Sequence, residues 1–143
     1  RKEGVLPITH SEMTRFNITV DEAVDIVLFA MEHAFGGEIF VPKLPSYRIL
    51  DLAKAIAPEC KTKIVGIREG EKIHEEMITR ADAIVTYDIG KYYVILQPKT
   101  SFNLDEFIAK HSATSVVDDF CYQSGNNDNF LTVDEIKELI RTA

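Results

Sequence analysis

The feature that most constrains the fold is a helix signal followed at once by a strand signal. Thr19 and Glu22 have the spacing of a capping box, in which a hydroxyl and a carboxylate accept hydrogen bonds from N–H groups at the start of a helix. Apolar residues then recur at helical spacing, at Val20, Ala23, Val24, Val27, Leu28 and Met31. Gly36-Gly37 ends this segment, and a short apolar run follows the glycines. We therefore expect a largely buried helix over residues 20–34 and a strand over residues 38–43.

Short strands and helices alternate along the first half of the chain. The stretch 47–57 is rich in Leu, Ala and Ile, and Pro58 ends it because proline cannot continue a helical hydrogen-bond ladder. The expected strands are 4–9, 13–18 and 62–67, and the further expected helices are 47–57, capped by Ser46, and 71–78. This order of elements predicts an α/β fold.

From Ala83 onward the pattern changes to the period of two that is typical of strands. The alternation runs through residues 84–96 around Gly90, which predicts a hairpin with a glycine turn. The remaining expected elements are a short helix at 104–110, a polar loop at 111–129 and a final helix begun by a second capping box, Thr132 with Glu135.

Charge and composition exclude several classes of protein. The 143 residues include 16 basic and 23 acidic side chains, so a broad surface for nucleic acid or anionic membrane is not expected. The longest apolar run, Ile26 to Met31, is far shorter than the ~20 residues that span a bilayer. Cys60 and Cys121 form no C-x-x-C pair, which argues against a zinc knuckle or a disulfide framework. We expect a cytoplasmic protein with no metal site.

Two short motifs suggest catalysis but lack a necessary part. His74-Glu75 begins like the helix of zinc proteases, yet Ile78 stands where the second histidine ligand is required. Tyr87 and Lys91 have the Y-x-x-x-K spacing of short-chain dehydrogenases, but they fall in the expected hairpin, where they would not share a helical face. No G-x-G-x-x-G sequence is present, so a complete dinucleotide-binding unit is not expected.

A weak signal for ligand binding lies at an expected strand-to-helix turn, where ligands of α/β proteins bind. Arg68 has a guanidinium suited to phosphate, and Glu71 could accept hydrogen bonds from sugar hydroxyls. Arg15, at the expected strand 13–18, is a further cation. Spacing alone leaves open the alternative that Arg68 and Glu71 form a surface ion pair capping the helix.

Five ordered motifs resemble one family of enzymes. They are Leu-Pro-Ile-Thr (6–9), Met-Thr-Arg-Phe (13–16), Asp-Glu-Ala-Val (21–24), Gly-Gly-Glu-Ile-Phe-Val-Pro-Lys (36–43) and Gly-Ile-Arg-Glu-Gly-Glu-Lys-Ile-His-Glu (66–75). The tail Tyr122-x-Ser124-x-Asn126-Asn127 fits the same pattern. Together they resemble the carboxyl-terminal half of the UDP-N-acetylglucosamine 4,6-dehydratases of pseudaminic acid and capsule synthesis, extended short-chain dehydrogenase relatives. The resemblance is closest to the 5-inverting type.

This resemblance implies that the two halves of the enzyme have different roles. In the family an amino-terminal Rossmann half holds NADP and the catalytic residues, and the carboxyl-terminal half holds the UDP-sugar. The chain is thus expected to be the UDP-sugar-binding portion of a longer enzyme, with no catalytic residue and no bound cofactor of its own, and inactive by itself. We expect residues 1–110 to form the binding region and residues 111–143 a polar loop and terminal helix. The expected partners are UDP-GlcNAc, the missing Rossmann half and further copies in a homo-oligomer, because apolar faces of the first two helices would otherwise be exposed.

The resemblance also implies roles for single residues. Arg15 is similar to an arginine that contacts the diphosphate, Arg68 to its partner on the opposite side, and Glu71 to the acid that holds the ribose hydroxyls. The segment that resembles the uracil-binding stretch, through backbone hydrogen bonds, contains Pro7, Ile8 and Thr9, with Met13. For His74 we expect hydrogen bonding or packing rather than acid–base catalysis, because no orienting partner is near it in sequence. The loop with Tyr122, Ser124 and Asn127 is a candidate latch over the sugar.

Two other interpretations remain open at this point. One is a non-catalytic module that binds nucleotide sugars for regulation or assembly. The other is a related UDP-sugar epimerase or retaining dehydratase, which would share the same nucleotide site.

Overall fold

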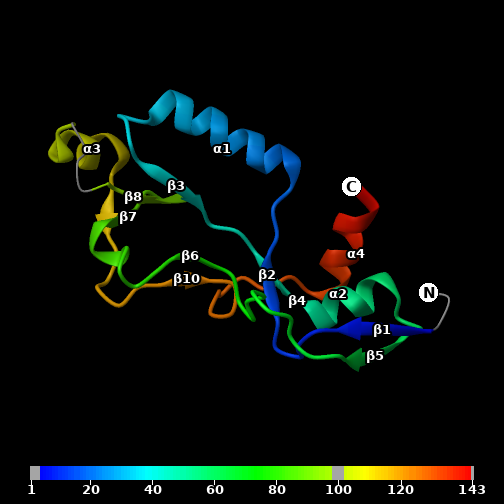
Figure 1. Cartoon of the computed structure of the whole chain (residues 1–143). Helices are drawn as coiled ribbons and strands as arrows, with labels where there is room; N and C mark the ends of the chain where they lie inside the picture. Colours follow the sequence, from blue (N-terminus) through cyan, green and yellow to red (C-terminus); the bar gives the residue numbers. More distant parts are fainter. Residues whose placement is uncertain (1–3, 98–101, 143) are drawn as a thin grey trace. The chain divides into compact units, whose positions relative to one another are not determined.

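The computed structural model describes residues 4–97 and 102–142, which fall into two compact units (Figure 1). Unit 1 contains Arg1–Asn17, Leu44–Glu75 and Gln123–Ala143, and unit 2 contains Ile18–Lys43 and Glu76–Tyr122. Each unit is therefore assembled from segments that are distant in sequence. Both units contain strands and helices, which confirms a mixed α/β fold.

Unit 2 is built on a four-stranded antiparallel sheet with the strand order β3-β8-β7-β9. Its strands are β3 (Ile39–Pro42), β7 (Thr86–Asp88), β8 (Tyr92–Ile95) and β9 (Thr114–Ser115). The expected hairpin is present as β7 and β8, and its turn includes Gly90 with a φ of 88°. Glycine suits this position because the left-handed region is strained for other residues. A 3₁₀ turn, η1 (Ala83–Val85), precedes β7 where the sequence pattern predicted strand.

The core of unit 2 lies between the sheet and the helix α3 (Leu104–His111). Its buried residues are Val94, Leu96, Phe107 and Ala113, with aromatic side chains packed around them. Phe107 is the largest fully buried side chain of the described residues. Burial of this cluster is the main apolar contribution that holds α3 against the hairpin.

The helix α1 (Val20–His33) lies along β3 in unit 2 (Figure 1). The predicted capping box is confirmed: the Glu22 N–H donates to Thr19 Oγ1 at 3.2 Å, and the Thr19 N–H donates to Glu22 Oε2 at 2.8 Å. Hydrogen bonds from the Thr19 backbone and side chain lower the pKa of Glu22.

The expectation that α1 is largely buried is wrong. No residue of α1 is buried, because the helix packs on the sheet through one side only, where the Phe29 ring lies 4.6 Å from that of Tyr92 and 5.6 Å from that of Phe40. Another stripe of apolar side chains is exposed to solvent, and Met31 at its end is 79% exposed. We call this stripe the outer face of α1; it consists of Val20, Val24, Val27, Leu28 and Met31.

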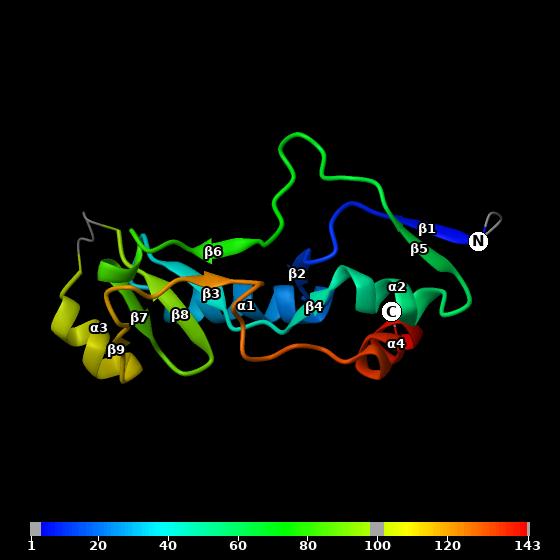
Figure 2. The same ribbon diagram turned by 90° about the horizontal axis from the view of Figure 1, so that it is seen from below.

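Unit 1 contains two short pairs of strands and two helices. The parallel pair is β1 (Val5–Ile8) with β5 (Lys61–Ile64), and the antiparallel pair is β2 (Thr14–Phe16) with β4 (Ser46–Arg48). The helices α2 (Ile49–Ile56) and α4 (Val133–Thr142) lie side by side (Figures 1 and 2). The apolar side of α2 is therefore covered in part by α4 and β1, whereas the outer face of α1 is exposed.

Ser46 does not cap α2 as the sequence suggested, because a distant segment uses it. Its N–H donates to the carbonyl of Asn129 at 2.8 Å, its carbonyl accepts from the N–H of Leu131 at 2.7 Å, and its hydroxyl accepts from the side chain of Asn127 at 2.9 Å. Ser46 is fully buried in β4, and α2 begins three residues later.

The expected helix over 71–78 is also absent. Residues 65–75 form an irregular loop after β5, which Figure 2 shows as an extended trace, and Glu76–Ile78 is the strand β6, paired with β10 (Tyr122–Gln123). Gly70, just before the expected start, has a φ of 79°, which lies outside the range of a right-handed helix. The end of the loop also gives its backbone hydrogen bonds to distant segments, so they are not available for a helix.

Across residues 4–97 and 102–142, no helix has the length and apolar content that crossing a membrane requires.

Candidate functional site

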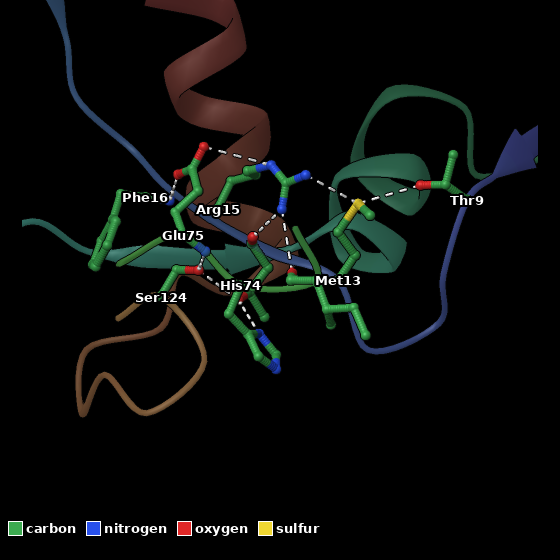
Figure 3. A network of polar contacts seen from close by, with 9 residues as sticks. Thr9, Met13, Arg15, Phe16, His74, Glu75 and Ser124 are labelled. Atoms are coloured by element: carbon green, nitrogen blue, oxygen red, sulfur yellow. Dashed lines mark hydrogen bonds and ion pairs between the residues drawn. The ribbon is translucent and has the colours of Figure 1, made fainter. Parts of the chain in front are cut away.

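Strand β2 places Arg15 at the centre of a set of polar contacts in unit 1 (Figure 3). Its Nη1 donates to the carbonyls of Thr14 at 2.6 Å and Ile73 at 3.2 Å, and its Nη2 donates to Met13 Sδ at 3.3 Å. The Nε atom lies 3.5 Å from Oε1 of Glu75. All three guanidinium nitrogens thus have a protein partner, and the side chain is 21% exposed.

Glu75 joins Arg15 to the backbone of β2. Its Oε2 accepts a hydrogen bond from the N–H of Phe16 at 3.1 Å, while Oε1 faces Arg15. The neighbouring Tyr47, on β4, has a raised pKa, mainly because of burial and also because of the Glu75 charge; Arg15 opposes this shift. The carboxylate therefore holds the guanidinium through a long contact that an anionic ligand could replace.

Two buried hydroxyls and one partly buried imidazole are hydrogen-bonded to one another next to these charges. Thr14 Oγ1 is 2.8 Å from His74 Nδ1 and 2.7 Å from Ser124 Oγ. Ser124 Oγ in turn accepts from the Glu75 N–H at 2.9 Å, and the Ser124 N–H donates to the Glu75 carbonyl at 2.8 Å. We call Thr14, His74 and Ser124 the Thr14 network.

Sequence reasoning anticipated hydrogen bonding by His74 but did not identify Thr14 or Ser124 as its neighbours. The side chains of the network are 60 and 110 residues from Thr14 along the chain, so no local spacing connects them. The available signal was the polar tail Tyr122-x-Ser124-x-Asn126-Asn127, in which one small hydroxyl residue stands beside residues that favour turns.

Three further predicted residues lie near Arg15 or on the strand before it. Thr9 Oγ1 donates to Met13 Sδ at 3.3 Å, the same sulfur that Arg15 contacts. Met13 is buried, as is Ile8 at the end of β1. The Ile8 carbonyl accepts from the N–H of Val65 at 2.8 Å, so this carbonyl is engaged by the residue that follows β5.

Arg68 and Glu71 form a separate turn on the loop 65–75. The Arg68 N–H donates to Glu71 Oε2 at 3.0 Å, and the Glu71 N–H donates to the Arg68 carbonyl at 3.1 Å. The carboxylate therefore binds the backbone of Arg68, and the Arg68 side chain is exposed. Among the described residues, the hydrogen bonds and ion pairs of Arg15 do not include Arg68 or Glu71.

Within the described part of the chain, no three His, Cys, Asp or Glu side chains are grouped so that they could hold a metal ion.

Comparisons with known proteins show the class to which this chain belongs. The model of the polysaccharide biosynthesis protein family matches residues 1–97, and the chain is a member of this family. It is 42% identical over 141 residues to the UDP-N-acetylglucosamine 4,6-dehydratase (inverting) of Campylobacter jejuni serotype O:2, a match that covers 94% of this chain and 42% of that protein. The resemblance inferred from the five motifs is therefore confirmed.

The chain is also similar to UDP-glucose 4-epimerases and to one solved structure. The UDP-glucose 4-epimerase of Rickettsia canadensis is 34% identical over 142 residues, which is 96% of this chain and 41% of that protein. The X-ray structure of Pen from Bacillus thuringiensis covers 99% of this chain and 42% of its own, with a TM-score of 0.77 and 23% identity. The last match shows a shared fold. The chain spans less than half the length of each of these proteins.

Proposed function

We propose that this chain is the UDP-sugar-binding portion of an NADP-dependent UDP-GlcNAc 4,6-dehydratase that inverts C5, in the synthesis of bacterial surface sugars such as pseudaminic acid. The observation that carries the proposal is the 42% identity over 141 residues to an inverting dehydratase. The epimerase relatives, at 34% identity or less, favour a related UDP-sugar epimerase as the second candidate.

The diphosphate is the part of the ligand that this chain is best suited to bind. Arg15 offers a guanidinium whose Nη1 already donates to two backbone carbonyls, and an anion would bind the remaining N–H of Nη2 or replace the 3.5 Å contact to Glu75. Arg68 supplies a second guanidinium from an exposed loop, which can move to the ligand. Two arginines on one diphosphate give charge-assisted hydrogen bonds that fix the nucleotide.

The other expected residues complete a site for the nucleoside. Glu71 is placed in a turn with Arg68 and binds the ribose hydroxyls, while Thr9 and Met13 lie beside Arg15 and line the uracil. Ile8 contributes by packing and by fixing β1, since its carbonyl is engaged with Val65. Holding the nucleotide in this way orients the sugar for reaction.

The chemistry of the proposed enzyme is transfer of a hydride from C4, loss of water across C5 and C6, and return of the hydride to C6 with protonation of C5, which inverts C5. NADP supplies the hydride acceptor and donor in that sequence. This chain has no G-x-G-x-x-G sequence, so NADP and the catalytic residues are assigned to the part of the longer protein that it does not span. Its own residues bind and orient, and by itself it is expected to be inactive.

The proposed partners follow from the same division. The outer face of α1 is an apolar surface suited to the Rossmann half or to a second copy of the chain. The proposed binding region is residues 1–110, with the ligand contacts at residues 8–15 and 68–71 of unit 1, and residues 111–143 supply the polar segment and α4. A cytoplasmic location suits an enzyme that uses nucleotide sugars. If the chain were instead a non-catalytic module, its gene would lack an upstream dinucleotide-binding signature.

Calorimetric titration with UDP tests the proposed site. Replacing Arg68 (Arg68→Ala) is expected to raise the Kd for UDP by about tenfold or more, because a charge-assisted hydrogen bond to the diphosphate is lost. Arg141→Ala is the matched control, since it removes the same charge from an exposed position on α4 and should leave the Kd unchanged. An Arg68→Ala chain that binds UDP as tightly as the wild type would rule out this residue as a ligand contact.

A further inference from the structure

We infer that the Thr14 network holds the guanidinium of Arg15 in its binding position, which makes Thr14, His74 and Ser124 positioning residues of the nucleotide site. The identity of the anionic ligand rests on the proposed function, whereas the positioning itself rests on the contacts of unit 1. Ser124, in the polar tail, would thus affect ligand binding through Arg15 without touching the ligand.

The first step is that one buried hydroxyl connects three segments of the chain. Thr14 is 4% exposed and Ser124 is fully buried. A hydroxyl has one hydrogen and two lone pairs, so Thr14 Oγ1 can donate to one of its two partners and accept from the other. Loss of this hydroxyl would leave the fully buried Ser124 Oγ and the partly buried His74 Nδ1 each without one partner, which is unfavourable.

The second step is that the groups that hold Arg15 lie on the segment that the network fixes. The Ile73 carbonyl accepts from both the Thr14 N–H, at 3.0 Å, and Arg15 Nη1, at 3.2 Å. Glu75, whose carboxylate faces Arg15 Nε, is tied to Ser124 through two hydrogen bonds of its backbone. His74 lies between these two residues. A shift of residues 73–75 would therefore move two of the four contacts of the guanidinium.

The third step is the close packing of the His74 ring against the tail. A Cβ atom built on Gly125 would lie 2.5 Å from His74 Nδ1, closer than such atoms approach one another in proteins. Glycine at this position therefore lets the ring reach Thr14, and a side chain there would displace it. In Figure 3 the His74 ring points away from the Arg15 guanidinium and the Glu75 carboxylate.

A matched pair of substitutions at Thr14 tests the inference in the full 143-residue chain. Thr14→Val removes the hydroxyl and keeps the shape, and Thr14→Ser keeps the hydroxyl. By calorimetry we expect Thr14→Val to raise the Kd for UDP about fivefold or more, and Thr14→Ser to stay within about twofold of the wild type. His74→Leu should weaken UDP binding similarly, and His74→Asn, which keeps a polar atom near the position of Nδ1, should restore much of it.

Two further comparisons separate positioning from general loosening of the fold. Uridine has no diphosphate, so its Kd should not change in Thr14→Val if the effect passes through Arg15. In the Arg15→Ala background, Thr14→Val should add nothing to the loss of UDP affinity, because the group being positioned is already absent. Equal weakening of UDP and uridine, or additive effects of the two substitutions, would overturn the inference.

A spectroscopic measurement tests the positioning without any ligand. The Arg15 Nε–H signal in a ¹H–¹⁵N spectrum should shift in Thr14→Val and in Gly125→Ala and stay in place in Thr14→Ser. An unchanged signal in folded Thr14→Val and Gly125→Ala chains would overturn the inference. Failure of the wild type to bind UDP, with the expected signal shifts present, would instead overturn the proposed function and leave the positioning of Arg15 supported.

Discussion

At the scale of single residues, the two units hold their partly buried ionisable side chains differently: Arg15 in unit 1 through polar partners, and His111 in unit 2 among aromatic rings. Around Arg15 every nitrogen has a protein partner, so the guanidinium is fixed in place before any ligand arrives. Such preorganisation lowers the entropy that a ligand must overcome. In unit 2 the imidazole of His111 lies among aromatic rings, with its ring centre 4.7 Å from that of Phe107, and its buried Nε2 has no hydrogen-bond partner among the described residues.

His111 should make the stability of unit 2 depend on pH. Burial lowers the pKa of His111, with a further contribution from the charge of Lys110. The folded state favours the neutral ring. The contribution of His111 to the free energy of unfolding is therefore fully present above the pKa of the unfolded state, about 6.5, and is lost as pH falls through the lower pKa of the folded state. The melting temperature of the chain should therefore fall between about pH 7 and pH 5, and His111→Phe should reduce this fall by removing the titrating group.

Thermal melts followed by circular dichroism across that pH range measure the effect. His10→Gln is a suitable control, because His10 lies in unit 1 and outside the aromatic cluster. A His111→Phe chain whose melting temperature changes with pH as steeply as that of the wild type would contradict this account of His111.

At the scale of elements, the sequence predicted well what depends on neighbouring residues and poorly what depends on distant ones. The capping boxes of α1 and α4 are present because both partners lie within one helical turn, as when the Thr132 N–H donates to Glu135 Oε2 at 2.8 Å. The start of α2 was misplaced because residues 127–131 recruit Ser46. The helix expected over 71–78 does not form for a similar reason, since residues 73–75 are hydrogen-bonded to β2 and to Ser124.

The outer face of α1 should drive reversible self-association of the chain. Its side chains are apolar and exposed, but the helix also carries Asp21, Glu22, Asp25 and Glu32 and no Lys or Arg. Two copies that meet through this face would bring like charges together, and salt would screen that repulsion. We expect light scattering to give an average mass that rises above 16.2 kDa as NaCl is increased from about 0.05 M to about 0.5 M.

Met31→Glu should keep the mass at that of one chain, because it places a charge at one of the two most exposed positions of the outer face. Ile140→Glu, on the exposed side of α4, controls for the loss of an apolar surface residue elsewhere. A wild-type chain that remains monomeric at every salt concentration would contradict self-association through the outer face of α1.

At the scale of the whole molecule, the two units divide the chain in a way that no composition shift revealed. Each unit is completed by a segment from the second half of the sequence, Gln123–Ala143 in unit 1 and Glu76–Tyr122 in unit 2, so local patterns could predict an α/β chain but not its assembly. The same holds for the candidate site. Motif order pointed to Arg15, Arg68 and Glu71, whereas the Thr14 network depends on contacts over 60 and 110 residues that only the folded chain brings together.

The central claim is that unit 1 binds a uridine diphosphate group, and chemical-shift mapping tests it most directly. UDP added to the ¹⁵N-labelled chain should cause saturable shifts at the amides of residues 8–16 and 66–75, and the amides of the β7–β8 hairpin in unit 2 should stay in place. Saturable shifts confined to unit 2, or none at all for a folded chain at millimolar UDP, would contradict the account.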